Sequence, residues 1–257
     1  MAVSVRNRRI LGLTAFVGLA LLMVLVEQRV LIPFASSRSP ADEVIYWQKH
    51  VERNGEGSAS HLRLGLAYSK TGQLNEAEDS FVAALDLKVD YDAAAIGRYG
   101  VVVRKGEQGR AVEELARYAR AYPSCAVCWQ NLAAEYLSRR DLRAAEAAVG
   151  ALLASDFSVD SKMYGVEDME VEASILAGRV YAARADQSRA IGFFRAAIEK
   201  NPNELRAYIL LGKNLLAMDD PGSALTVLND ALARTDGDGR NEREIERLIR
   251  RARQVRR

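Results

Sequence analysis

The sequence predicts an all-α fold built from consecutive helical hairpins. Segments 61–70 and 75–87 each place apolar residues at i, i+3, i+4 and i+7, which is the spacing of one face of an amphipathic helix. Thr71, Gly72 and Gln73 separate the two segments as a turn. No segment shows the sustained period-two alternation of a half-buried strand, so we expect no sheet.

The hairpin at 58–89 recurs along the chain. Adding 34 to Gly72 and Ala77 gives Gly106 and Ala111, and a second addition of 34 leads to a third hairpin. The register then slips by eleven residues before two more hairpins follow. The pattern therefore predicts repeats at 58–91, 92–125, 126–159, 171–204 and 205–238, with an insertion at 160–170.

Small residues at close helix contacts and large residues beside them repeat in the same register. In the first unit these are Leu64, Gly65, Tyr68, Ala77, Phe81 and Ala84, and in the third they are Trp129, Leu132, Ala133, Tyr136 and Ala145. This arrangement resembles the tetratricopeptide repeat (TPR), which has a period of 34 residues. The resemblance implies a TPR-like α-solenoid of about five hairpins that binds other proteins, although such repeats serve many roles.

The N-terminal region predicts a membrane anchor. A basic tail at 1–9 precedes an uncharged apolar run, and we assign one transmembrane helix to 10–32. A cleaved signal peptide and a buried helix are the alternatives. Arg6, Arg8 and Arg9 precede the span, whereas Arg29 and Arg38 follow its core, which favours a cytoplasmic N-terminus and repeats exported to the periplasmic side.

Both ends of the repeats are expected to carry capping helices, because a terminal repeat exposes an apolar face. Residues 33–57 combine a linker with a helix at 42–53 that has an apolar side. Residues 239–257 form a basic helix with an apolar stripe at Ile245, Leu248, Ile249, Ala252 and Val255. Its arginines either form a solvated face or contact anionic lipid or an acidic protein.

The insertion at 160–170 contains Met163, Tyr164 and Met169, which look exposed. Insertions in repeat proteins map to loops, often on the binding face. We therefore consider both a tolerated surface loop and a contribution to partner binding.

Cys125 and Cys128 form the only reactive-looking motif, at the expected start of a helix after Ser124. Three interpretations remain open: a disulfide, two unpaired packing cysteines, or a redox pair. Two cysteines and two histidines are too few for a self-contained four-ligand zinc site, so we expect no metal.

Composition and motifs argue against catalysis and against nucleic-acid binding. The net charge is only +2, and the chain contains no catalytic triad, phosphate-binding loop or His-Glu-x-x-His motif. His50 and His61 are isolated. We expect no cofactor and no enzymatic activity.

In the TPR family the first helix of each pair lines a concave groove. The resemblance places Leu62, Leu66, Ile96, Val103, Gln130, Leu137, Ile175, Arg179, Ile209, Lys213 and Leu216 at groove positions. A mostly apolar groove suits an amphipathic helix or an extended apolar segment of a partner. The alternative is that the helix at 42–53 partly fills the groove.

Two functions are consistent with these features. The first is a membrane-anchored scaffold that binds a protein partner in the assembly or stabilisation of a membrane or envelope complex. The second is a redox or maturation factor that uses Cys125 and Cys128, because similar membrane-anchored TPR proteins assist c-type cytochrome assembly.

Overall fold

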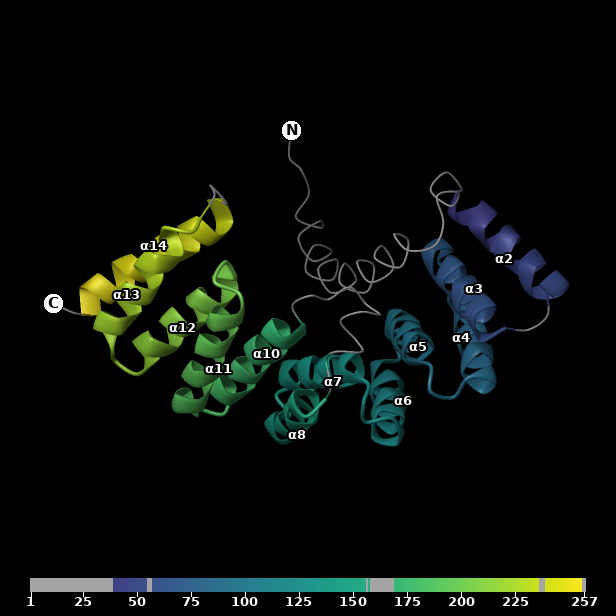
Figure 1. Cartoon of the computed structure of the whole chain (residues 1–257), viewed down its shortest axis with the longest axis horizontal. Helices are drawn as coiled ribbons and strands as arrows, with labels where there is room; N and C mark the ends of the chain where they lie inside the picture. Colours follow the sequence, from purple (N-terminus) through teal and green to yellow (C-terminus); the bar gives the residue numbers. More distant parts are fainter. Residues whose placement is uncertain (1–38, 55–56, 156, 158–168, 236–238, 256–257) are drawn as a thin grey trace. The chain divides into compact units, whose positions relative to one another are not determined.

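The fold is all-α, as predicted. The computed structural model describes residues 39–54, 57–155, 157, 169–235 and 239–255, and these form twelve α-helices and no strand (Figure 1). The predicted membrane span at 10–32 lies outside the described residues. Among the helices that are described, none combines the length and the apolar character needed to cross a membrane.

The chain divides into two compact units, and the division falls after Cys128 within one helix. The first unit contains α2 (Pro40–Asn54), α3 (Ser58–Thr71), α4 (Leu74–Leu87), α5 (Asp92–Arg104), α6 (Gln108–Ala121) and the beginning of α7 (Ala126–Ser138). The second contains the rest of α7, α8 (Leu142–Leu153), α10 (Met169–Ala183), α11 (Gln187–Lys200), α12 (Leu205–Ala217), α13 (Pro221–Leu232) and α14 (Gly239–Val255). We call α3, α5, α7, α10 and α12 the first helices, and α4, α6, α8, α11 and α13 the second helices.

One backbone feature separates the first helix from the second in every pair. Gly72 and Gly106 have φ of 81° and 83°, and Arg140, Ala185 and Asp219 have φ of 60°, 62° and 58°. A left-handed residue at this point ends a helix by satisfying its last carbonyl groups. Successive members lie 34 residues apart, except that 45 residues separate Arg140 from Ala185.

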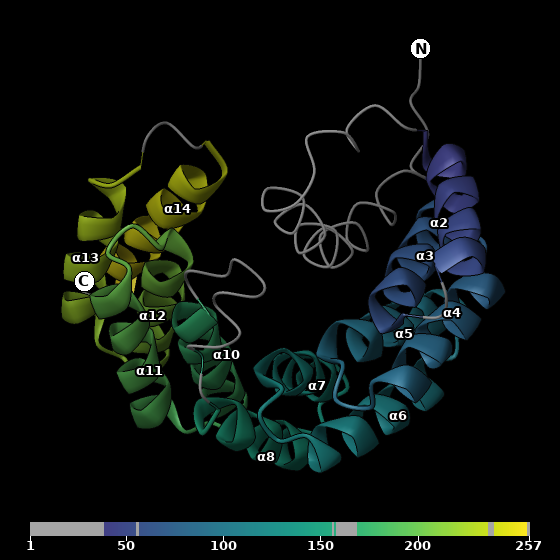
Figure 2. The ribbon, with the colours of Figure 1, turned by 45° about the vertical axis from the view of Figure 1, so that its right-hand side comes forward.

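The residue after the left-handed one is the N-cap of the second helix. Asp141, Asp186 and Asp220 each accept a hydrogen bond from a backbone N–H three residues later, which satisfies a donor that the first turn leaves free. Figures 1 and 2 show the resulting antiparallel pairs, such as α3 with α4 and α10 with α11.

Glycines allow the paired helices to approach closely. The buried ring of Phe81 lies against Gly65 of α3 and Gly97 of α5, where an added Cβ would come within 2.8 and 2.6 Å of ring atoms. In the second unit Gly178 receives Phe194 in the same way, with 2.4 Å between the added Cβ and the ring. Phe81 of α4 and Phe194 of α11 therefore fill spaces that glycines leave.

An ion-pair network joins the second helix α4 to α5 and α6. Both guanidinium nitrogens of Arg110 donate to the carboxylate of Glu78, at 2.7 and 3.1 Å, and Lys105 donates to it at 2.8 Å. The Arg110 hydrogen bonds outweigh burial and, with Lys105, lower the pKa of Glu78 to about 2. The network therefore favours the charged form of Glu78 in the folded state.

The N-terminal helix α2 packs on α3. It begins at Pro40, two residues before the predicted start, because the Ser39 hydroxyl accepts from the Asp42 N–H and proline suits the first helical position. The Gln48 amide donates to the Tyr68 hydroxyl at 2.6 Å. Ile45, which we assigned to the apolar side, is instead half exposed.

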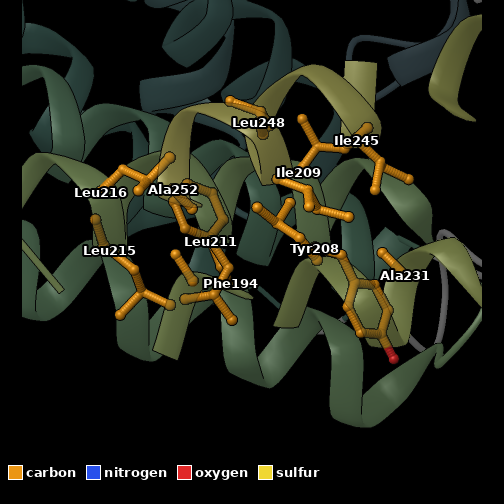
Figure 3. Packing of buried hydrophobic residues seen from close by; sticks show 14 residues of the cluster. Phe194, Tyr208, Ile209, Leu211, Leu215, Leu216, Ala231, Ile245, Leu248 and Ala252 are labelled. Carbon is orange, nitrogen blue, oxygen red and sulfur yellow. The ribbon is translucent and has the colours of Figure 1, made fainter. Parts of the chain in front are cut away.

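The C-terminal helix α14 packs on α13 and α12 (Figure 3). Ile245, Leu248, Ile249 and Ala252 are buried in one cluster with residues of α12 and α13. Val255 does not continue this stripe, since 48% of it is exposed at the end of the helix.

The insertion at 160–170 lies mostly outside the described residues, including Met163 and Tyr164. The prediction that Met169 is exposed is wrong. Met169 is the first residue of α10 and is buried, because the helix begins before the predicted end of the insertion.

Candidate functional site

The candidate binding surface is the set of predicted groove positions on the first helices, which we call the first-helix face. Its members in the first unit are Leu62, Leu66, Ile96 and Val103, on α3 and α5. Its members in the second unit are Gln130, Leu137, Ile175, Arg179, Ile209, Lys213 and Leu216, on α7, α10 and α12. The structure divides these residues into a packed group and an accessible group.

Two of the predicted groove residues are core residues. Leu62 is 3% exposed and packs in a cluster with Ala77, Phe81 and Val101, so its side chain lies between α3, α4 and α5. Ile175 of α10 is buried against Ala197 and Ala207 of α11 and α12. Neither side chain is open to a partner, because the second helix of its own hairpin and the first helix of the next hairpin pack on it.

The groove positions of α12 are closed by α14. Figure 3 shows Ile209 beneath Ile245 and Leu248, and Leu216 belongs to the same buried cluster. The Lys213 ammonium lies 3.0 Å from the Glu244 carboxylate of α14. The predicted accessibility of Ile209 and Leu216 was therefore wrong, because the chain's own terminal helix packs on α12.

The accessible apolar residues of the first unit are Leu66, Ile96 and Val103, which are all half-buried. They lie on α3 and α5, which are in contact. The Arg104 guanidinium fixes this pair of helices, because it donates to the Ser69 carbonyl at 2.8 Å and to the Ser69 hydroxyl at 2.7 Å.

In the second unit the accessible positions are more polar. Gln130 and Leu137 of α7 are half-buried, and Arg179 of α10 is exposed. Arg206 of α12 pairs with Glu172 of α10, two helices that are in contact. The apolar part of the face that remains open is therefore concentrated on α3 and α5.

The exposed side of α14 is basic. Arg243, Arg247, Arg250, Arg251 and Arg253 are exposed, and two of them pair within the helix, Arg247 with Glu244 and Arg250 with Glu246. The described part of the helix thus has a buried apolar side and a cationic outer side.

Cys125 and Cys128 are joined by a disulfide. Cys125 precedes α7, and the Cys128 N–H donates to the Cys125 Sγ at 3.2 Å, so a sulfur atom accepts from the first turn. The two residues are 1% and 0% exposed. Burial keeps both sulfur atoms from contact with a protein substrate, so it gives the proposed redox role no support.

Asp92, at the start of α5, is a neighbour of the disulfide that the sequence analysis missed. One carboxylate oxygen and the two Sγ atoms all lie within 4.8 Å of one another. The Tyr118 hydroxyl of α6 donates to Asp92 at 2.7 Å. Burial raises the pKa of the Asp92 carboxyl, and the Tyr118 hydrogen bond opposes this shift.

The repeat spacing contains the signal for this proximity. Adding 34 to Asp92 gives Ala126, the residue between Cys125 and Val127. Equivalent positions of successive hairpins lie near one another in a stacked array. The aspartate and the cysteine pair therefore approach each other although 33 residues separate Asp92 from Cys125.

The first hairpin matches a known repeat. A family model of the tetratricopeptide repeat matches residues 58–90, which include α3 and α4. The chain has the tetratricopeptide-repeat fold. No curated protein matches the sequence of this chain significantly.

Solved structures resemble this chain over most of its length. The crystal structure of YrrB, described as a TPR protein with an unusual peptide-binding site, is 18% identical, with a TM-score of 0.57 over 81% of this chain and 97% of YrrB. PilF of Pseudomonas aeruginosa is 15% identical, with a TM-score of 0.57 over 77% of this chain and 86% of PilF. The C-terminal part of a TPR protein from Cytophaga hutchinsonii is 10% identical, with a TM-score of 0.61 over 84% and 94% of the two chains.

Proposed function

We propose that this chain is a non-enzymatic scaffold that binds an apolar segment of a protein partner on the α3–α5 part of the first-helix face. The observation that carries the proposal is the half-exposure of Leu66, Ile96 and Val103 on two helices that are in contact. Among the apolar counterparts in the second unit, Leu137 is half-buried, and Ile175, Ile209 and Leu216 are buried.

The chemistry of this surface favours an apolar ligand. Three aliphatic side chains on adjacent helices offer contact area without a directed hydrogen bond, which suits the apolar side of an amphipathic helix. The Lys-Asn-Arg set that holds a peptide carboxylate in some TPR domains is absent from the predicted groove positions of the first three repeats. The peptide-binding site named for YrrB supports a peptide as the class of ligand.

Recovery of the partner from detergent-solubilised membranes tests the proposal. Leu66→Asp with Val103→Asp places two carboxylates on the face, whereas Leu87→Asp changes a residue at the end of α4 that is already 47% exposed. We expect the double variant to lose a partner that the wild type and Leu87→Asp retain. Circular dichroism confirms that each variant is folded, and equal recovery with all three proteins would contradict binding at this face.

The proposal also includes an anchor at 10–32 and export of the repeats, so that the scaffold acts in the assembly or stabilisation of a membrane or envelope complex. The apolar run in the sequence and the disulfide support it, because disulfides persist in oxidising compartments. The exposed arginines of α14 are then available to anionic lipid or an acidic protein.

Protease protection tests this topology. In intact cells whose outer membrane has been permeabilised, an added protease should degrade the repeats of an exported chain. Degradation only after the inner membrane is lysed would contradict export, and recovery of the chain in the membrane-free fraction would contradict anchoring.

A further inference from the structure

The disulfide and Asp92 form a cluster with the composition of a metal site. Cys125 immediately precedes α7, Cys128 lies in the first turn of α7, and Asp92 begins α5. One oxygen and two sulfur atoms of these residues lie within 4.8 Å of one another. This is the one group of three metal-ligating residues in the described part of the chain. All three residues belong to the first unit.

The backbone around the cysteines already has a conformation that suits two thiolates. Their Cα atoms are 5.3 Å apart, so both sulfur atoms face the same volume. The Cys128 N–H points at the Cys125 Sγ at 3.2 Å, and a hydrogen bond of this kind favours a thiolate. Breaking the sulfur–sulfur bond would therefore leave two ligands on one turn without rearrangement of α7.

Asp92 is held in place by a partner of its own. The Tyr118 hydroxyl donates to one carboxylate oxygen at 2.7 Å, which orients the group. Hydrogen bonds of this outer kind orient ligands and tune metal sites. Asp92 is also less buried than the two cysteines.

We propose that reduction of the Cys125–Cys128 disulfide creates a site that binds one zinc ion through two thiolates and the Asp92 carboxylate. A dithiol reductant supplies two electrons and two protons, and it becomes a disulfide while two thiols form. Zinc then displaces both thiol protons to solvent, and water completes a tetrahedral site. Thiolates select zinc over magnesium and calcium, which prefer oxygen ligands.

The two states exclude each other, because the sulfur atoms cannot form a disulfide and bind zinc as thiolates at once. The cluster is then closed by the disulfide in an oxidising compartment and open to metal in a reducing one. This inference does not depend on the proposed partner binding, and in an exported chain the cluster would be in its closed, disulfide state.

Cobalt titration of the purified full-length protein tests the site, because cobalt occupies zinc sites and reports its ligands by absorption. After treatment with a dithiol under anaerobic conditions and removal of the reductant, we expect one equivalent of Co²⁺ to give thiolate charge-transfer bands and tetrahedral ligand-field bands. One equivalent of Zn²⁺ should abolish both. The oxidised protein should give neither signal.

Two variants separate ligation from a general effect on folding. Mutating a residue that only hydrogen-bonds to a metal ligand lowers metal affinity by about 10–100-fold. Because Asp92→Asn removes a ligand itself, it should weaken cobalt binding by at least about tenfold. Asp90→Asn, an exposed acidic neighbour, should bind as the wild type does. Circular dichroism checks that each variant is folded before titration.

The expected signals in the reduced wild type, with weakening only in Asp92→Asn, would establish the site. An absence of charge-transfer bands in the folded, reduced wild type would overturn the proposal. Equal cobalt affinity of Asp92→Asn and Asp90→Asn would remove Asp92 from the site and overturn the three-ligand assignment.

Discussion

Gly178 gives the sharpest test of how the hairpins pack. An ideal Cβ at this position would lie 2.4, 2.7 and 2.8 Å from three atoms of the Phe194 ring, whereas ordinary contacts begin near 3.4 Å. Phe194 is fully buried, so the ring has no solvent to move into. Gly178→Ala should therefore force the two helices of this hairpin apart.

The magnitude follows from two opposing effects. Alanine in place of glycine stabilises a helix interior by about 1 kcal/mol. Overpacking of a well-packed core costs about 1–3 kcal/mol, and a clash with a buried ring belongs at the upper end. We expect Gly178→Ala to lower the free energy of unfolding by about 2 kcal/mol.

Gly192 provides a matched control in the same hairpin. It lies in α11, it is exposed, and an added Cβ meets nothing within 4 Å. Gly192→Ala should therefore raise the free energy of unfolding by about 1 kcal/mol. The two alanine variants should then differ by about 3 kcal/mol, which is about a hundredfold in the unfolding equilibrium.

Urea denaturation followed by circular dichroism measures both variants, and unchanged slopes show that the comparison is valid. Combining Gly178→Ala with Phe194→Leu should recover part of the loss, because a smaller side chain leaves room for the methyl group. Stabilisation of equal size by Gly178→Ala and Gly192→Ala would refute the packing argument.

Three further predictions concern the turns, the ion pairs and the terminal helix. Ala185→Gly should stabilise the chain by about 1 kcal/mol, because φ of 62° strains an alanine and not a glycine, and thermal denaturation measures the gain. Glu78→Gln should cost up to about 3 kcal/mol at pH 7. The folded pKa of Glu78 is about 2 and its ordinary value is 4.5, so the contribution is present above pH 4.5 and lost as the pH falls toward 2, and urea titrations should show the two proteins converging there. Ile245→Ala should cost about 2–5 kcal/mol by leaving a cavity over Ile209, whereas Val255→Ala, at an exposed position, should change stability little.

Local patterns predicted the helices well because each hairpin carries its own signals. The apolar spacing of 61–70 and 75–87 and the turn at Gly72 correspond to α3, α4 and a left-handed residue. The equivalent turns at Arg140 and Ala185 carry no such signal, because neither residue type favours positive φ. Their conformation follows from the packing of the helices on both sides.

Relations between hairpins were harder to predict than the hairpins themselves. The sequence indicated a terminal helix with an apolar stripe and, separately, placed Ile209 on an open face. Only the packing of α14 on α12 shows that the apolar stripe of α14 covers Ile209 and that α12 covers the stripe. The approach of Asp92 to Cys125 likewise depends on how the first turns of α5 and α7 stack. The spacing of residues within a single helix does not reveal this stacking.

Site-specific photo-crosslinking tests the central claim of partner binding most directly. A photoreactive phenylalanine derivative replaces Ile96 on α5 in one protein and exposed Leu87 on α4 in another, and both are irradiated in cells. We expect a discrete crosslinked protein from position 96 that is absent from position 87 and is lost with Leu66→Asp. The same crosslinked product from both positions, or none from position 96 while the chain remains folded, would contradict it.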